Sequence, residues 1–194
     1  DVHPSTLTAS NNLSVLLFDQ GKNAEAEELL REVLVVQQRK LGEEHPSTLN
    51  LRQNLSVLLS SQGEFEEAEH EMRGILEIYR KTLGNTHPDT LRSITGLGAM
   101  LEHLGRFPEA EELLQEALDT ARRVLGDEHP VTLNSINKLG LVLWSQKEMG
   151  KAVMLFREAL KAYRGMLGDE HPITLNVISN LGNALREQGV ADEA

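Results

Sequence analysis

Apolar residues recur at helical spacing along this chain, in pairs of segments separated by a glycine. In one first segment the apolar positions are Leu51, Leu55, Leu58 and Leu59. In the segment that follows they are Ala68, Met72, Ile75, Leu76 and Tyr79. Steps of three and four residues place such side chains on one face of an α-helix. Gly63 and Gly84 end the two segments, because glycine tolerates the left-handed conformation of a C-terminal cap. The pattern predicts two helices that pack as a hairpin.

This hairpin pattern repeats every 42 residues along the chain. His-Pro pairs stand at residues 3–4, 45–46, 87–88, 129–130 and 171–172. Proline suits the first turn of a helix, where its missing N–H costs nothing, so each pair predicts the start of a first helix. An alanine column keeps the same step, at Ala26, Ala68, Ala110, Ala152 and Ala194. We therefore expect an all-α protein, a stack of antiparallel helical hairpins in which each repeat packs mainly on its neighbours.

The repeat spacing also predicts the domain organisation. We expect a single solenoid over residues 1–194, with four complete helix pairs at about residues 5–41, 47–83, 89–125 and 131–167. An unpaired first helix of a fifth repeat is expected at about residues 173–188, where Gly189 occupies the turn column. Neither end shows the polar cap that terminal repeats normally carry, so we expect a fragment of a longer array.

A few positions depart from the repeat. Lys147 stands in the column of turn glycines, which predicts an altered turn in the fourth repeat. Glu71 stands in a column otherwise held by leucine. Gly74 and Gly165 lie inside second helices, where each costs up to about 1 kcal/mol relative to alanine.

The repeat resembles a known family. The residues Asn54, Leu55, Ser56, Gly63, Phe65, Ala68 and Leu76 resemble the tetratricopeptide signature of small and large positions on two helices. The 42-residue length and the boundary Leu-Gly-x-x-His-Pro-x-Thr-Leu are similar to the kinesin-light-chain subclass. Similar arrays form the repeat arms of NTPase-linked sensor proteins. The resemblance implies a right-handed α-α superhelix whose first helices line a concave groove that binds a peptide.

Carrying the groove-facing columns over to this sequence gives a set of candidate binding residues that is rich in asparagine. They are Asn11, Asn12, Asn50, Gln53, Asn54, Arg92, Asn134, Asn137, Lys138, Trp144, Asn176, Asn180, Asn183 and Arg186. An asparagine amide offers donors and an acceptor, so a row of them could hydrogen-bond an extended peptide backbone. The alternative is that some of these amides bond across the helix–helix contact.

The three cations and the tryptophan of this set can each be interpreted in two ways. Arg92, Lys138 and Arg186 could bind a ligand carboxylate, or they could form weak surface pairs with neighbours such as Glu102 and Glu187. Trp144, the single tryptophan, could anchor a partner or pack against the turn at Lys147. Both questions stay open at the level of sequence.

Composition narrows the classes of partner. The formal net charge of −11 repels the phosphate backbone and anionic lipid, so we expect neither nucleic-acid nor membrane binding. No apolar run approaches the ~20 residues of a membrane-spanning helix. Cysteine is absent, which excludes disulfides and thiol catalysis and suits a cytoplasmic, intracellular protein.

The recurring histidines do not predict a metal site. Packed helix axes lie 8–10 Å apart, whereas zinc ligands converge to about 2 Å from one ion. The sequence also lacks a phosphate-binding glycine loop and a nucleophile elbow. We therefore expect no enzyme activity, no metal and no cofactor.

Two functions remain. The first is a protein–protein interaction scaffold that binds a peptide segment in the groove. The alternative is a structural or sensor arm of a larger multidomain protein, acting through self-association at the open ends of the array.

Overall fold

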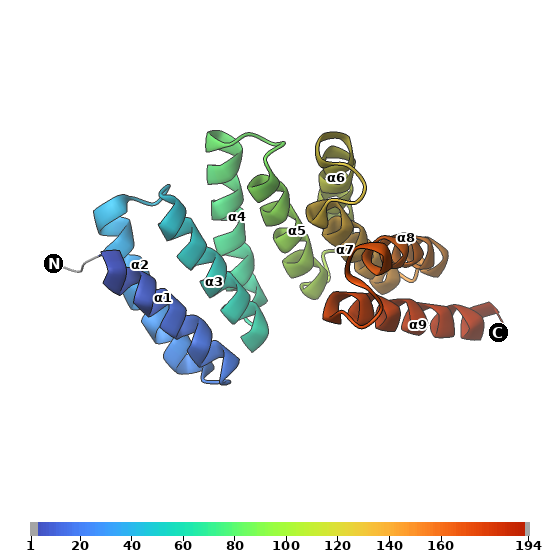
Figure 1. Cartoon of the computed structure of the whole chain (residues 1–194), viewed down its shortest axis with the longest axis horizontal. Coiled ribbons are helices and arrows are strands. Elements are labelled where there is room, and N and C mark those ends of the chain that lie inside the picture. The colour runs from blue at the N-terminus through green and yellow to red at the C-terminus, as the bar shows by residue number, and fades with distance from the viewer. Residues whose placement is uncertain (1–3, 193–194) are drawn as a thin grey trace. The chain divides into compact units, whose positions relative to one another are not determined.

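The computed structural model describes residues 4–192, and over that range the chain forms nine α-helices and no strand (Figure 1). The chain divides into two compact units, and each is described by itself. The helices of unit 1 are α1 (Pro4–Asp19), α2 (Asn23–Leu41), α3 (Pro46–Gln62) and α4 (Phe65–Thr82). The helices of unit 2 are α5 (Pro88–His103), α6 (Phe107–Leu125), α7 (Pro130–Ser145), α8 (Met149–Leu167) and α9 (Pro172–Asp192). The single solenoid expected from the sequence stays a prediction.

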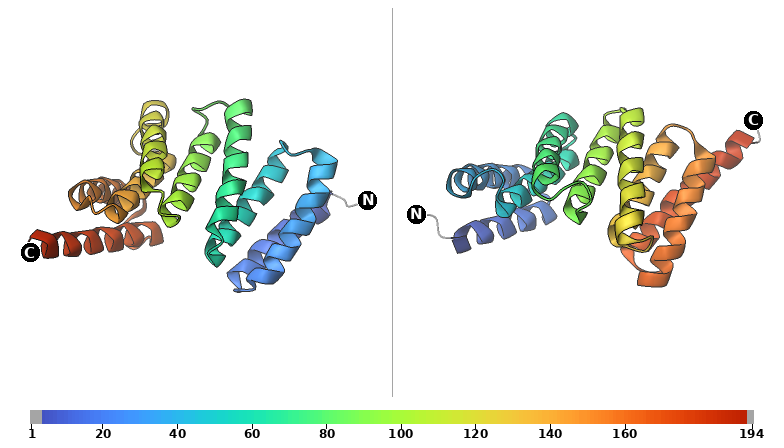
Figure 2. Two further views of the ribbon diagram at one scale, coloured as in Figure 1. Left: turned by 180° about the vertical axis from the view of Figure 1, so that it is seen from behind. Right: turned by 90° about the horizontal axis from the view of Figure 1, so that it is seen from above.

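Consecutive helices pair as hairpins within each unit. In unit 1, α1 packs on α2 and α3 on α4, while α2 also contacts α3. Unit 2 repeats this order, because α6 contacts both α5 and α7, and α8 contacts both α7 and α9. The first helices of adjacent hairpins also meet, as α1 with α3, α5 with α7, and α7 with α9. Seen from behind in Figure 2, α2 lies in front of α1.

The His-Pro pairs start the first helices, as the sequence predicts. His45, His87 and His129 are N-cap residues with extended backbone, and each proline follows at the first helical position. The imidazole Nδ1 of each histidine accepts a hydrogen bond of 3.2 Å from the backbone N–H two residues later. His171 makes the same bond at the start of α9. The imidazole thus satisfies one of the N–H groups that a helix start leaves free. His3 and Ala194 lie outside the described residues.

Small residues let the two helices of a hairpin approach closely. Ala26, Ala68, Ala110 and Ala152 are fully buried on the second helices. Opposite them, Gly98 of α5 and Gly140 of α7 contact large side chains of their hairpin partners. A Cβ added to Gly140 would lie 2.7 Å from Cε1 of Phe156, and one added to Gly98 would lie 2.6 Å from Cγ of Leu114. These glycines are therefore packing residues rather than helix-breaking positions.

The fourth turn is not altered, so the sequence-based expectation for Lys147 is wrong. Lys147 has a φ of 68°, close to the 71° of Gly105 at the same repeat position. Its backbone N–H donates to the Trp144 carbonyl at 2.9 Å, and the N–H of Gly105 donates to Glu102 at 3.0 Å. The capping hydrogen bonds hold the turn in one conformation, and lysine adopts the left-handed region at an energetic cost.

The last helix ends later than the glycine column predicts. α9 continues through Gly189 to Asp192, whereas the expected end is near residue 188. In the other hairpins the turn is held by a second helix that packs back on the first. No second helix follows α9 within the described residues, so nothing there favours a turn at Gly189.

The irregular residues of the second hairpin form one compensated set. Nε of Arg52 in α3 donates to Oε2 of Glu71 in α4 at 2.6 Å, and both side chains are largely buried. A Cβ on Gly74 would lie 2.5 Å from Nη2 of Arg52, so the glycine makes room for the guanidinium. In unit 2 the position of Arg52 is held by the buried Ile94 and that of Glu71 by Leu113. An ion pair therefore replaces an apolar pair in unit 1.

Replacing Gly140 by alanine should destabilise the protein although alanine is the better helix former. The added methyl must displace Phe156, and overpacking of this kind costs about 1–3 kcal/mol. Gly182 occupies the same repeat position in α9 and has no atom within 4 Å of an added Cβ. Gly182→Ala should therefore raise stability by up to about 1 kcal/mol. Urea unfolding followed by circular dichroism measures both changes, and equal shifts of the two midpoints would contradict the packing role.

Lys147→Gly should stabilise the protein by about 1 kcal/mol, because glycine adopts the left-handed region without the steric cost that lysine carries. The ion pair lost with Glu187 spans 3.6 Å and is exposed, so it contributes little. The reciprocal variant Gly105→Lys should lower stability by a similar amount. A Cβ added at Gly105 would have no atom within 4 Å, so only the backbone would be strained. Thermal unfolding compares the two; a Lys147→Gly protein no more stable than the parent would show that the turn carries no strain.

Candidate functional site

A groove of about 650 Å³ in unit 2 gathers four of the predicted binding residues. We call it the α7–α9 groove. Its polar lining comes from first helices: Asn134, Asn137 and Lys138 of α7, and Asn176 of α9. Its apolar lining comes mainly from the end of α8 and the start of α9, as Tyr163, Met166, Leu167, Pro172 and Ile173. Pro130 and His171 complete it. Residues of two repeats meet here because α8 packs on both α7 and α9, which also contact each other.

The polar groups of this groove can still bind a ligand. Asn134 and Asn176 are exposed, and the Oδ1 of Asn176 accepts one hydrogen bond of 3.3 Å from Asn180. Lys138 is half-buried, and among the described residues it has neither an ion pair nor a hydrogen bond. Its ammonium is therefore free to pair with an anion. The groove offers one cation and several amides.

The apolar wall of the groove is partly exposed. Met166, Leu167 and Ile173 each present more than a third of their surface to solvent. Tyr163 is buried beside them, and this burial raises the pKa of its phenol, so the ring stays neutral. An apolar ligand side chain placed here would cover surface that is now in water, which is the main favourable contribution to association.

Four of the predicted asparagines form two hydrogen-bonded pairs across adjacent first helices. Nδ2 of Asn54 donates to Oδ1 of Asn11 at 2.8 Å in unit 1. Nδ2 of Asn180 donates to Oδ1 of Asn137 at 3.3 Å in unit 2. The two pairs occupy equivalent repeat positions, 43 residues apart in each case. For Asn54 and Asn180 this supports the structural interpretation, that the amides join packed helices.

A second cross-helix contact lies two helical turns farther along. Nε1 of Trp144 donates to Oε2 of Glu187 at 3.0 Å, and Oγ of Ser145 donates to Glu102 at 2.7 Å. The hydrogen bond from Trp144 lowers the pKa of Glu187, and the charge of Lys147 adds to this effect. Trp144 is half-buried and lines a separate hollow of about 240 Å³ with Leu141 and these residues. It therefore joins α7 to α9 outside the α7–α9 groove.

The remaining predicted residues do not gather at one place. Asn12 and Asn50 are exposed and Gln53 is half-buried in unit 1. Arg92 pairs with Asp89 at 2.9 Å, one turn away on its own helix. Asn183 and Arg186 lie toward the far end of α9, and neither lines the α7–α9 groove. Of the three predicted cations, Lys138 is the one that lines this groove.

Sequence reasoning missed the apolar half of the groove. Tyr163 stands in the column of Tyr79, which the sequence places on the apolar face of a second helix, and Met166 and Leu167 stand at the end of such a helix. Their participation depends on how closely α8 ends beside the start of α9. The one signal of this apolar wall in the sequence is that Met166 and Leu167 stand shortly before the His-Pro pair at residues 171–172.

No group of three or more His, Cys, Asp or Glu residues in the described part of the chain could hold a metal ion. None of the described helices is long and apolar enough to cross a membrane.

Solved structures similar to this chain include proteins built of TPR-like repeats. One contains the nearly identical TPR-like repeats of a kinesin light chain candidate from Podosopora anserina. It shares 30% identity with a TM-score of 0.78 and covers 98% of this chain and 90% of its own. A point variant of that protein gives a TM-score of 0.79 at 30% identity, with the same coverage. BtubC (BKLC) from P. vanneervenii is 22% identical, with a TM-score of 0.78 over 95% of this chain and 74% of its own, and it supports the fold alone.

A family model gives the same assignment from the sequence. The tetratricopeptide repeat model matches residues 5–73, 61–119, 93–165 and 137–194. A search of curated proteins found no match. The helical hairpins and the similar structures confirm the expected all-α helical-repeat superhelix class. The chain therefore belongs to the tetratricopeptide repeat family of protein-interaction scaffolds, and its repeats are of the kinesin-light-chain type.

Proposed function

We propose that this chain binds a peptide segment of a partner protein in the α7–α9 groove. The observation that carries the proposal is the meeting of Asn134, Asn137, Lys138 and Asn176 in one groove beside partly exposed apolar side chains. Binding sites of this size usually combine an apolar lining with a few polar groups that set orientation. We further propose an intracellular scaffold, in keeping with the absence of cysteine.

The chemistry of the groove suggests how the segment is held. Asn134 and Asn176 can hydrogen-bond the peptide backbone, because each amide offers both a donor and an acceptor. These bonds do not depend on the peptide's side chains. Specificity would come from two features that contact the side chains of the peptide. These are the apolar wall around Met166 and Ile173 and the unpaired ammonium of Lys138. We therefore expect a segment that carries an apolar side chain and a carboxylate.

Peptides selected from a random display library against the full chain test this proposal. Asn134→Ala and Asn176→Ala should each weaken their binding about five-fold, the loss expected for one hydrogen bond worth about 1 kcal/mol. Lys138→Ala should weaken acidic peptides more than neutral ones. Asn50→Ala is the matched control, because Asn50 occupies the same repeat position in unit 1 and is equally exposed. Calorimetry gives the affinities and circular dichroism confirms the helix content; unchanged affinity in all three groove variants would reject the groove.

A second candidate function is a structural or sensor arm that self-associates. Apolar side chains that are buried in internal hairpins are exposed on the first and last described helices. Leu16 of α1 is 52% exposed, whereas Leu58 at the same position of α3 is 2% exposed. Leu175 of α9 is 52% exposed, against 1% for Leu133 of α7. Contact with another copy would cover these faces and remove apolar surface from water.

Light scattering on a size-exclusion column, over a range of protein concentrations, distinguishes the two candidates. A peptide-binding scaffold should keep a constant mass near 21.6 kDa. Self-association should raise the mass in multiples of that value, and Leu175→Glu should then restore the monomer. Met154→Glu is the control, because Met154 is also exposed but lies on α8. A constant mass at every concentration removes the self-association hypothesis.

A further inference from the structure

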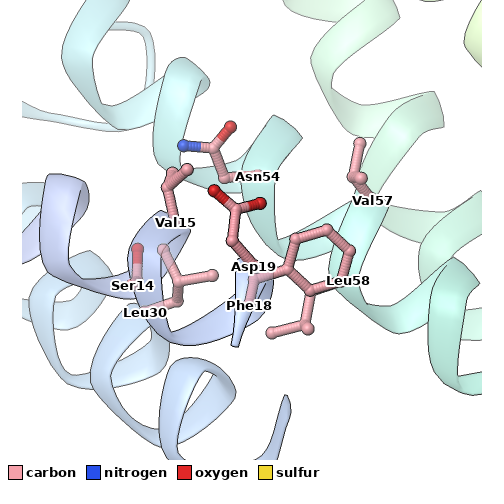
Figure 3. Close-up of a pocket in the computed structure, with 8 residues that line it drawn as sticks. All are labelled: Ser14, Val15, Phe18, Asp19, Leu30, Asn54, Val57 and Leu58. Atoms are coloured by element: carbon pink, nitrogen blue, oxygen red, sulfur yellow. The ribbon is translucent and has the colours of Figure 1, made fainter. Parts of the chain in front are cut away.

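Unit 1 contains a second hollow, separate from the α7–α9 groove. It has a volume of about 250 Å³ and lies between α1, α2 and α3 (Figure 3). Val15 and Phe18 of α1, Leu30 of α2 and Val57 of α3 give it a mainly apolar lining. Val15 and Val57 are exposed, so part of this lining faces solvent. We call it the unit 1 pocket.

The pocket lies at a level where a cross-helix hydrogen bond of unit 2 has no counterpart between the corresponding residues of unit 1. In unit 2, Trp144 of α7 bonds to Glu187 of α9. The corresponding residues of α1 and α3 are Phe18 and Ser61. Phe18 has no donor, and the hydroxyl of Ser61 donates to the Leu58 carbonyl of its own helix at 2.7 Å. Phe18 and Ser61 are therefore not joined by a hydrogen bond, and the Phe18 ring lines the pocket.

The unused polar groups at the pocket are acceptors. Asp19 lines the pocket, and Figure 3 shows its carboxylate between the side chains of Val15 and Phe18. Among the described residues Asp19 has no ion pair. Asn54 uses an N–H to bond to Asn11, while its Oδ1 has no partner in the described part of the chain. The hydroxyl of Ser14 already donates to the Asn11 carbonyl at 2.7 Å.

We propose that the unit 1 pocket binds a partner-protein segment in which a bulky apolar side chain is followed by lysine or arginine. The apolar side chain would fill the space beside Phe18, and the adjacent cation would bond to the Asp19 carboxylate and the Asn54 oxygen. Ammonium and guanidinium groups carry donors and no acceptor, which suits a site whose free polar groups accept. The net charge of −11 also favours a basic segment over an acidic one.

The ligand charge proposed for the unit 1 pocket is opposite to the one proposed for the α7–α9 groove. Lys138 makes that groove suited to a carboxylate, whereas Asp19 makes the unit 1 pocket suited to a cation. The two sites lie in different units and are lined by different residues. The proposal for the unit 1 pocket therefore stands whether or not the groove binds a peptide.

Methyl NMR of the full chain tests the proposal with defined peptides. The probe is the capped hexapeptide Gly-Ser-Leu-Arg-Ser-Gly, compared with peptides that carry Glu in place of Arg or Ser in place of Leu. The Leu-Arg peptide should produce saturable shifts of the methyl groups of Val15, Leu30 and Val57. Either replacement in the peptide should weaken binding about ten-fold, because each removes one of the two recognised groups.

Variants of exposed residues separate the pocket from general charge attraction. Asp19→Asn and Val57→Ser should each weaken the Leu-Arg peptide about ten-fold. Glu43→Gln and Val35→Ser, which change exposed residues of unit 1 away from the pocket, should leave the affinity unchanged. Circular dichroism verifies that all four variants keep their helix content.

Three outcomes would overturn the proposal. The first is the absence of saturable shifts at millimolar Leu-Arg peptide. The second is equal binding of the Arg and Glu peptides. The third is a set of methyl shifts that follow protein concentration without peptide, because a second copy of the chain would then occupy the pocket.

Discussion

The close contact between the two helices of each hairpin is the constraint on which the rest of this structure depends. It requires small residues where the backbones approach, and the fully buried alanines of the second helices and Gly98 and Gly140 of the first meet that requirement. Because the helices are this close, large side chains such as Phe156 fill the space over the glycines. Where a first helix lies between two second helices, as α3 and α7 do, its apolar face is covered and its other residues are left for contacts with adjacent first helices.

Those remaining residues form a regular set of contacts between first helices. Asparagine pairs occupy one level, and Trp144 with Glu187 occupies a level two turns away. Hollows remain beside some of these side chains, next to Trp144 in unit 2 and next to Phe18 in unit 1. The same scaffold therefore carries hollows of different charge, with Lys138 at one and Asp19 at another.

Local irregularities were harder to interpret than the repeat itself. The sequence showed that Glu71 and Gly74 break their columns, but not that Arg52 lies between them and makes the exchange consistent. It also suggested a changed turn at Lys147, whereas the capping hydrogen bonds hold lysine in the conformation of the glycines it replaces. In the first case the deciding interaction joins residues of two different helices, and in the second it is the set of backbone bonds that every such turn makes.

The sequence by itself determined the all-α class, the repeat length, the helix starts at the His-Pro pairs and the family. These follow from local rules, because helical periodicity, proline at the first turn and histidine before it act within a few residues. Tertiary structure alone decided which of the predicted residues meet. Asn134, Lys138 and Asn176 gather with Met166 and Ile173, while Trp144 and Arg92 have partners elsewhere. The physical reason is that a groove is made by the approach of neighbouring helices, and that approach depends on side chains packed between them.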